Sequence, residues 1–179
     1  MTSTHPSLTQ LTDPSGVTAD LRHALTACWV EVTNAGGAAG FPFPPVEAVD
    51  VMPFLDAITQ KLDPQTSRLL VAEHGGQLAG WLNLRRDPGP LIAHWGTIHH
   101  LQARPTLQGG LGTALMNEAR RIARDEMHLE QLHLAARGGV GLETFYARLG
   151  WKEIGRWPDA LRLTGDDNRD EILMLLAPL

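Results

Sequence analysis

Gln108-Gly-Gly-Leu-Gly-Thr-Ala-Leu115 joins a predicted strand to a predicted amphipathic helix. Glycines in such a turn let backbone N–H groups approach an anion closely, and the start of the helix adds unpaired N–H donors and the positive end of its dipole. No Gly-Lys-Ser/Thr follows and no complete G-x-G-x-x-G is present, which disfavours a nucleoside-triphosphate P-loop and a dinucleotide site. The segment therefore predicts a phosphate-binding site, with an ordinary tight turn between strand and helix as the alternative.

Hydrophobic periodicity assigns secondary structure on both sides of this segment. Alternation with a period of two predicts strands, and apolar residues spaced by three and four predict helices. Gly75-Gly76 supplies a two-residue hairpin turn between two of the strands. The predicted strands cover residues 7–11, 69–74, 78–84, 91–103, 129–136, 152–157 and 171–176, and the predicted helices cover 17–32, 46–61, 111–123 and 142–149.

The order of these elements indicates the fold class. Three strands joined by tight turns indicate an antiparallel meander, and the later strand–helix–strand part indicates a parallel pair with a crossover. We therefore expect an α/β (α+β) fold with a mixed, mostly antiparallel central sheet flanked by helices. No repeat, low-complexity tract or linker divides the chain, so we expect residues 1–179 to form a single domain. Within it, we expect residues 1–7 to be disordered.

Composition argues against several classes of partner. The chain has 15 basic and 20 acidic residues and a formal charge of -5, without a Lys/Arg-rich block, which argues against nucleic acid. Its apolar runs are too short to span a membrane, and no signal peptide is visible. The single cysteine, Cys28, fits a reducing compartment. We therefore expect a cytoplasmic protein, whose oligomeric state, a homodimer included, the sequence leaves open.

Two motifs carry a resemblance to a known family. The segment 105–115 is similar to the acetyl-CoA-binding motif of the GNAT superfamily of N-acetyltransferases, although Leu107 stands where Gln or Arg is usual. Phe145-Tyr-Ala-Arg-Leu-Gly-Trp151 resembles the F-Y-x-x-L-G-F stretch of the same enzymes, although Gly139 stands where Asn is often found. A predicted strand separates the two motifs, as in the superfamily. Weaker likeness at 32–41 and 155–160 resembles the tabtoxin-resistance type.

The resemblance implies a GNAT-like acyl-CoA N-acyltransferase fold with acetyl-CoA as co-substrate. It places the pyrophosphate on the amides of the glycine-rich segment, and the acetyl carbonyl and pantetheine arm on backbone groups of the preceding strand. The implied cofactor-binding residues are Leu101, Ala103, Gln108, Gly109, Gly110, Leu111, Gly112 and Thr113. No metal is expected, because His99 and His100 are adjacent on a strand and no Cys or close carboxylate joins them.

Two side chains are candidates for proton transfer. The resemblance places Tyr146, the only tyrosine, as the general acid for the CoA thiolate; a packing role is the alternative. By strand alternation His99 shares a face with Leu101 and Ala103, where it could take the amine's proton directly or through water. A histidine with an ordinary pKa would then give an inflection in kcat/KM for the amine at about pH 6.5 to 7.5. His100 is an equal candidate if a bulge shifts the face, and water alone is a third.

The sequence thus predicts an acetyl-CoA-dependent N-acetyltransferase. We expect it to act on a primary amine of a small molecule by direct attack in a ternary complex, because no convincing nucleophile is present. Phe41 and Trp29 are candidates for the acceptor pocket or for the core. A cationic amine is expected from the acidic residues predicted to surround the site, which are Asp56, Asp63, Glu143, Asp159, Asp166 and Asp167. The alternatives are a non-catalytic acyl-CoA-binding regulatory module and a protein or peptide amine acetyltransferase; the acceptor and the length of the acyl group stay open.

Overall fold

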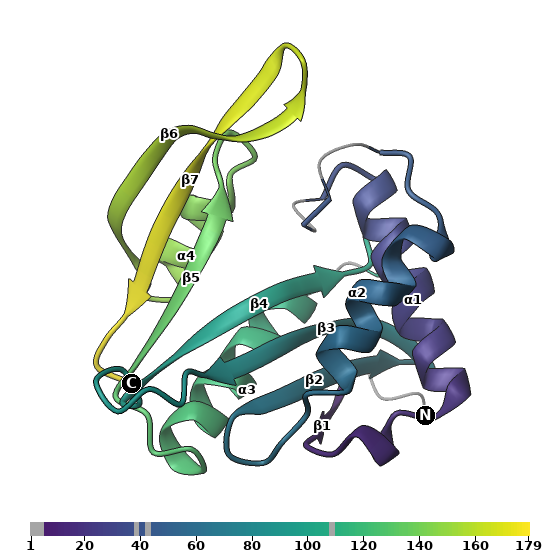
Figure 1. Ribbon diagram of the computed structural model, residues 1–179, viewed down its shortest axis with the longest axis horizontal. Coiled ribbons are helices and arrows are strands. Elements are labelled where there is room, and N and C mark those ends of the chain that lie inside the picture. The colour runs from purple at the N-terminus through teal and green to yellow at the C-terminus, as the bar shows by residue number, and fades with distance from the viewer. Residues whose placement is uncertain (1–5, 38–39, 42–43, 108–109) are drawn as a thin grey trace.

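The computed structural model describes residues 6–37, 40–41, 44–107 and 110–179, which form a seven-stranded sheet flanked by four α-helices (Figure 1). The strand order is β1-β2-β3-β4-β5-β7-β6, and within the described residues only β4 and β5 run parallel. The strands are β1 (Ser7–Leu11), β2 (Ser67–His74), β3 (Gln77–Arg86), β4 (Trp95–Ala103), β5 (Gln131–Arg137), β6 (Lys152–Thr164) and β7 (Asp167–Leu176). The helices are α1 (Ala19–Asn34), α2 (Ala48–Thr59), α3 (Leu111–Asp125) and α4 (Leu142–Arg148). The predicted mixed, mostly antiparallel sheet is confirmed.

The helices cover both faces of the sheet. In Figure 1, α1 and α2 lie in front of β2, β3 and β4, and α3 and α4 lie behind the sheet. The predicted apolar stripe of α3 is buried against the sheet, with Leu115, Ala119 and Ile122 fully shielded from solvent. On the other face, Trp29 of α1 packs edge-on against Trp81 of β3, with ring centroids 5.2 Å apart. No helix in the described part of the chain is both long and apolar enough to span a membrane.

A bulge interrupts β4 at His100. Asn83 of β3 pairs with His99, and Trp81 pairs with Gln102, one residue further along β4 than regular pairing would give. Leu82 therefore stands opposite both His100 and Leu101. His100 has a φ of 55°, in the left-handed region that non-glycine residues seldom adopt. Because a bulge inserts one residue, every side chain after it changes face.

The predicted face of His99 is therefore wrong. Ile98 and Leu101 both pack against the apolar core beneath α3, although regular alternation would place them on opposite faces. His99, next to Ile98 and paired with Asn83, lies instead on the face that carries α1 and α2. The ring of His100 also lies on this face, with its centroid 4.9 Å from that of Trp29. Both histidines are thus on the α1/α2 face, whereas Leu101 is on the α3 face.

The two halves of the sheet diverge at the parallel pair. β4 and β5 are paired only along residues 95–97 and 131–133. Beyond this point the strands separate, and Figure 1 shows β5, β6 and β7 turning away from β4. The facing edges of both strands therefore present backbone N–H and C=O groups that the ladder does not use.

Several predicted boundaries differ from the structure. β4 begins at Trp95 and not at residue 91, because residues 91–94 form turns in which Ile92 N–H donates to the Gly89 carbonyl and Trp95 N–H to the Ile92 carbonyl. β6 and β7 form a longer arm than predicted from 152–157 and 171–176, because β6 is exposed along most of its length and needs no apolar alternation. Of the predicted disordered residues 1–7, Ser7 begins β1, and residues 1–5 lie outside the described part.

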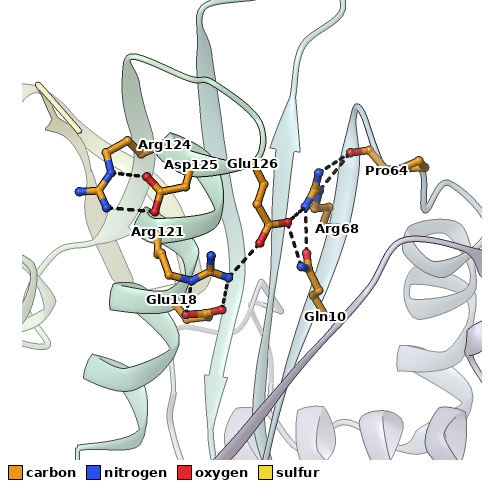
Figure 2. Close-up of polar contacts among 8 residues, drawn as sticks. All are labelled: Gln10, Pro64, Arg68, Glu118, Arg121, Arg124, Asp125 and Glu126. Carbon is orange, nitrogen blue, oxygen red and sulfur yellow. Dashed lines mark hydrogen bonds and ion pairs between the residues drawn. The ribbon is translucent and has the colours of Figure 1, made fainter.

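A polar network anchors the end of α3 to the β1–β2 edge. Figure 2 shows the buried guanidinium of Arg68, which donates to the Pro64 carbonyl, to the Gln10 side chain and to Glu126. Glu126, directly after α3, also accepts from Gln10 at 2.9 Å and from Arg121 at 2.9 Å. These hydrogen bonds lower the pKa of Glu126, so that the carboxylate stays charged. The network holds the C-terminal end of α3 while its first turn faces the end of β4.

We predict that a methyl group on Gly80 destabilises the β3–β4 pair. A Cβ at Gly80 would lie 2.4 Å from the backbone carbonyl oxygen of Gln102, and a backbone atom cannot move aside cheaply. Gly80→Ala should therefore lower the free energy of unfolding by about 1 to 3 kcal/mol in urea titrations. Gly165→Ala, at a site where a Cβ meets nothing within 4 Å, is the matched control and should change it little. Equal stabilities of the two variants would contradict the packing described for β3 and β4.

Candidate active site

Two adjoining cavities lie on either side of the end of β5. The central cavity, of about 390 Å³, lies between the diverging strands and reaches Tyr146 of α4. The outer cavity, of about 360 Å³, lies between the end of β5 and the β6–β7 arm and reaches Phe41. The residues that line both are Gly40, Ala135, Ala136, Arg137 and Glu171. A molecule in the outer cavity can therefore reach into the central one.

A third cavity, the loop cavity, lies at the start of α3 and has a volume of about 380 Å³. Gly110 is the N-cap of α3, with a φ of 82° and no side-chain hydrogen bond to the helix. The N–H groups of the first turn, at Leu111, Gly112 and Thr113, have no acceptor within the helix. The N-terminal end of α3 therefore presents donors and a positive dipole end to this cavity.

The structure brings most of the predicted cofactor-binding residues to these cavities. Leu101 lines the central cavity. Those that line the loop cavity are Ala103, Gly110, Leu111, Gly112 and Thr113. Gln108 and Gly109 lie outside the described residues.

The loop cavity fits a phosphate-bearing chain. A Cβ built on Gly110 would meet no atom within 4 Å, so the space above the N-cap is open to a ligand. A Cβ on Gly112 would lie 3.2 Å from the ring of Phe145, so glycine allows this ring to approach the helix closely. Arg104 lines the same cavity and is ion-paired with Glu31 at 3.0 Å, while its Nε is buried without a hydrogen-bond partner among the described residues. These groups could hold the pyrophosphate, and the open edge of β4 could hold the arm of acetyl-CoA.

Two adjacent residues of α4, Phe145 and Tyr146, lie between the loop cavity and the central cavity. Phe145 lines the loop cavity and Tyr146 the central one, with ring centroids 5.1 Å apart. Tyr146 is buried, and burial raises the pKa of its phenol to about 12. The hydroxyl therefore stays protonated at neutral pH and is available as a proton donor on the wall of the central cavity.

Both candidate histidines line the central cavity as well. Burial, with a smaller contribution from the charge of Arg85, lowers the pKa of His99 to about 4. The same two causes lower the pKa of His100. Both imidazoles are neutral at pH 7, so the inflection expected near pH 6.5 to 7.5 from an ordinary histidine loses its basis. The geometry brings Tyr146, His99 and His100 to one cavity without choosing between the two histidines.

Sequence reasoning missed Arg137 and Glu171. Arg137 ends β5 and Glu171 lies on β7, and the two residues pair directly across the strands. No local motif marks either residue, because only the β5–β7 pairing brings them together. Of the two aromatic candidates for the acceptor pocket, Phe41 lines the outer cavity, whereas Trp29 is buried in the core beneath α1.

The acidic residues expected around the site lie elsewhere. None of the six is among the described residues that line the central or the outer cavity. Asp56 is ion-paired with Arg22 on the helices, and Asp167 is ion-paired with Arg169 on the arm. The argument for a cationic acceptor based on these carboxylates is therefore wrong.

The fold and the loop cavity are compatible with an acetyltransferase, and sequence comparison assigns the family. The sequence profile of the family described as Acetyltransferase (GNAT) domain matches residues 46–157. The chain therefore belongs to the GNAT acetyltransferase family, as the resemblance predicted. A search of curated proteins found no matching relative.

Solved structures share the fold over nearly the whole chain. The ribosomal-protein-alanine N-acetyltransferase from Brucella melitensis superposes with a TM-score of 0.72 at 18% identity, over 96% of this chain and 99% of that one. The N-acetyltransferase from Staphylococcus aureus Mu50 gives 0.73 at 11% identity, over 96% and 98%. The Salmonella typhimurium protein yncA, solved with its cofactor acetyl-CoA, gives 0.69 at 15% identity, over 97% and 94%.

We predict that Gly110→Val weakens the binding of acetyl-CoA. The added side chain would enter the open space above the N-cap of α3, where an anion must approach the N–H groups. The dissociation constant measured by calorimetry should rise about tenfold or more, as for the loss of one hydrogen bond to a charged group.

The control for this variant is Gly76→Val, at the tip of the β2–β3 hairpin. Gly76 has a φ of 76° and Gly110 one of 82°, and a Cβ on either meets nothing within 4 Å, so both substitutions carry similar backbone strain. Gly76→Val should leave the affinity unchanged. Equal affinities for acetyl-CoA in the two variants would contradict the assignment of the loop cavity.

Proposed function

We propose that this acetyltransferase moves acetyl from acetyl-CoA to a primary amine of a small molecule. The observation that carries the proposal is the size and lining of the acceptor cavities. The α1–α2 segment contributes Gly40 and Phe41, and the β6–β7 arm contributes residues 160–163, to the walls of the outer cavity. The central and outer cavities have volumes typical of small-molecule sites.

The residues of the central cavity support direct attack in a ternary complex. The amine nitrogen, once neutral, forms a bond to the thioester carbonyl carbon, the carbon–sulfur bond breaks, and the thiolate must gain a proton. The protonated hydroxyl of Tyr146 can supply this proton, and the neutral ring of His99 or His100, or water, can take the proton that the amine loses.

A covalent acyl-enzyme finds no support in the cavity walls. Cys28 lies on the buried face of α1, and burial raises the pKa of its thiol to about 11. Such a thiol is a poor nucleophile because only its thiolate attacks. Cys28 is also absent from the described residues that line the three cavities.

Turnover separates this proposal from a non-catalytic acyl-CoA-binding module. A screen of small amines that follows the release of free CoA should find substrates, and a parallel screen of peptides should find none. Release of CoA with peptides alone would instead support a peptide acetyltransferase. Binding of acetyl-CoA without turnover on any amine would support the regulatory module. The cytoplasmic location stays a prediction.

We predict that Tyr146→Phe slows transfer without loss of fold. The variant keeps the buried ring and removes the proton donor, so kcat should fall about ten- to ten-thousand-fold at saturating substrates. The affinity for acetyl-CoA and the melting temperature should stay near those of the parent protein. Single-turnover rates are the measurement of choice, because slow product release would mask the effect. Full single-turnover activity in Tyr146→Phe would reduce this residue to a packing role.

We predict that His99 gives no inflection near neutral pH. Because burial holds the pKa of His99 near 4, its base form is already complete from about pH 5 upward. The value of kcat/KM for the amine should therefore rise only through the pKa of the amine itself. His99→Ala should lower the rate without moving this inflection, whereas His74→Ala, on the exposed β2–β3 hairpin, should do neither. An inflection near pH 7 that disappears in His99→Ala would contradict the burial of this ring.

A further inference from the structure

Arg137 is a half-buried cation without an ion-pair partner among the described residues, at the junction of the two acceptor cavities. Its side chain lines both the central and the outer cavity. Its Nε is buried and makes no hydrogen bond to any described residue, and its one hydrogen bond there is a long one of 3.4 Å to the Phe41 carbonyl. No described carboxylate lies within ion-pair distance of it.

Neighbouring arginines behave differently. On the same arm, Arg169 is ion-paired with Asp167, and Arg156 is ion-paired with Glu153 at 2.9 Å and with Asp170 at 3.0 Å. Of these three arginines, only Arg137 has no carboxylate partner among the described residues.

The environment of Arg137 favours an incoming anion. Burial is the main cause that lowers the pKa of its guanidinium, and the charge of Arg169 adds to this, while Asp167 opposes it. A desolvated charge without a counter-ion is unfavourable, so an anionic group in the cavity would regain the lost interaction. The planar fork of a guanidinium matches a carboxylate or phosphate with two parallel hydrogen bonds.

A carboxylate stands directly across from this cation. Glu171 of β7 is the cross-strand partner of Arg137, is half-buried and lines both cavities, yet it forms no ion pair with Arg137. One positive and one negative group thus face the cavity side by side, within about 5.5 Å at their backbones. This pattern matches a ligand that carries an ammonium and an anion on neighbouring atoms.

We infer that the acceptor is an α-amino acid or a similar amine with an adjacent anionic group, and that Arg137 is the residue that binds this anion. The inference rests on the proposed function and specifies its substrate class. Glu171 attracts the amino group toward the central cavity, where Tyr146 and His99 lie. The side chain of the acceptor then extends into the outer cavity, beside Phe41 and the apolar Leu161 and Leu163.

The first test compares matched acceptors on the parent enzyme. Each α-amino acid of a panel is assayed beside its carboxamide and its decarboxylated amine, with free CoA as the readout. Acceptors that carry the carboxylate should have a kcat/KM about ten- to hundredfold higher, as expected for a paired charge. Equal or better turnover of the uncharged analogues overturns the inference and leaves the proposed function intact. No turnover of any amine overturns both.

The second test removes the cation. Arg137→Met should raise KM for the carboxylate-bearing acceptor about ten- to hundredfold. The value of kcat, KM for the decarboxylated amine and the affinity for acetyl-CoA should change little. Arg137→Lys should recover part of the loss. Arg156→Met, which removes an exposed and paired arginine of the arm outside the lining of the two acceptor cavities, should leave KM unchanged.

The melting temperature separates binding from a structural role. Because Arg137 has no ion pair to lose, Arg137→Met should retain the melting temperature of the parent protein or exceed it. A weaker affinity for acetyl-CoA would overturn the inference by placing Arg137 on the donor. An equal rise of KM for charged and uncharged acceptors, or a marked loss of stability, would overturn it by assigning a structural role.

Discussion

β4 separates from β5 just before the bulge at His100, and the central cavity depends on that separation. One additional residue on β4 follows the short parallel pairing and increases the twist of the strand. The strand edges then face a cavity instead of each other, and both histidines come to lie on the face of α1 and α2. The same strand leads to the N-cap of α3, so the open edge and the uncapped helix start are close together in the chain.

Burial favours the neutral forms of the reacting groups. It lowers the pKa of His99, which is unprotonated at pH 7, and raises the pKa of Tyr146, which is protonated at pH 7 as a phenol ordinarily is. The central cavity thus presents a neutral donor and a neutral acceptor of protons. Fixed charges lie at the margins, where α3 begins and where Arg137 faces Glu171. An amine can thus lose its charge in the central cavity while an anionic group on the same molecule stays paired outside it.

The two ends of α3 have different roles that depend on each other. Its apolar stripe and the network of Arg68 and Glu126 fix the helix against the sheet. Its first turn has no side-chain cap, so its N–H groups stay available to a ligand. A helix held only by its N-terminal turn would move when that ligand leaves, whereas the anchoring at Glu126 keeps the donors in place.

The sequence by itself determined the element order, the mixed sheet, the family and the glycine-rich start of α3, because hydrophobic periodicity and the glycine-rich motif are local properties of the chain. It also singled out Tyr146, which the structure brings to the same cavity as His99. Only the tertiary structure decided the face of the histidines, since a one-residue bulge has no signature in an alternating strand. The long exposed arm likewise lacks the burial that creates a pattern. Arg137 and Glu171 are 34 residues apart by their numbers and meet through the β5–β7 pairing alone, so the acceptor side of the cavity exists only in three dimensions.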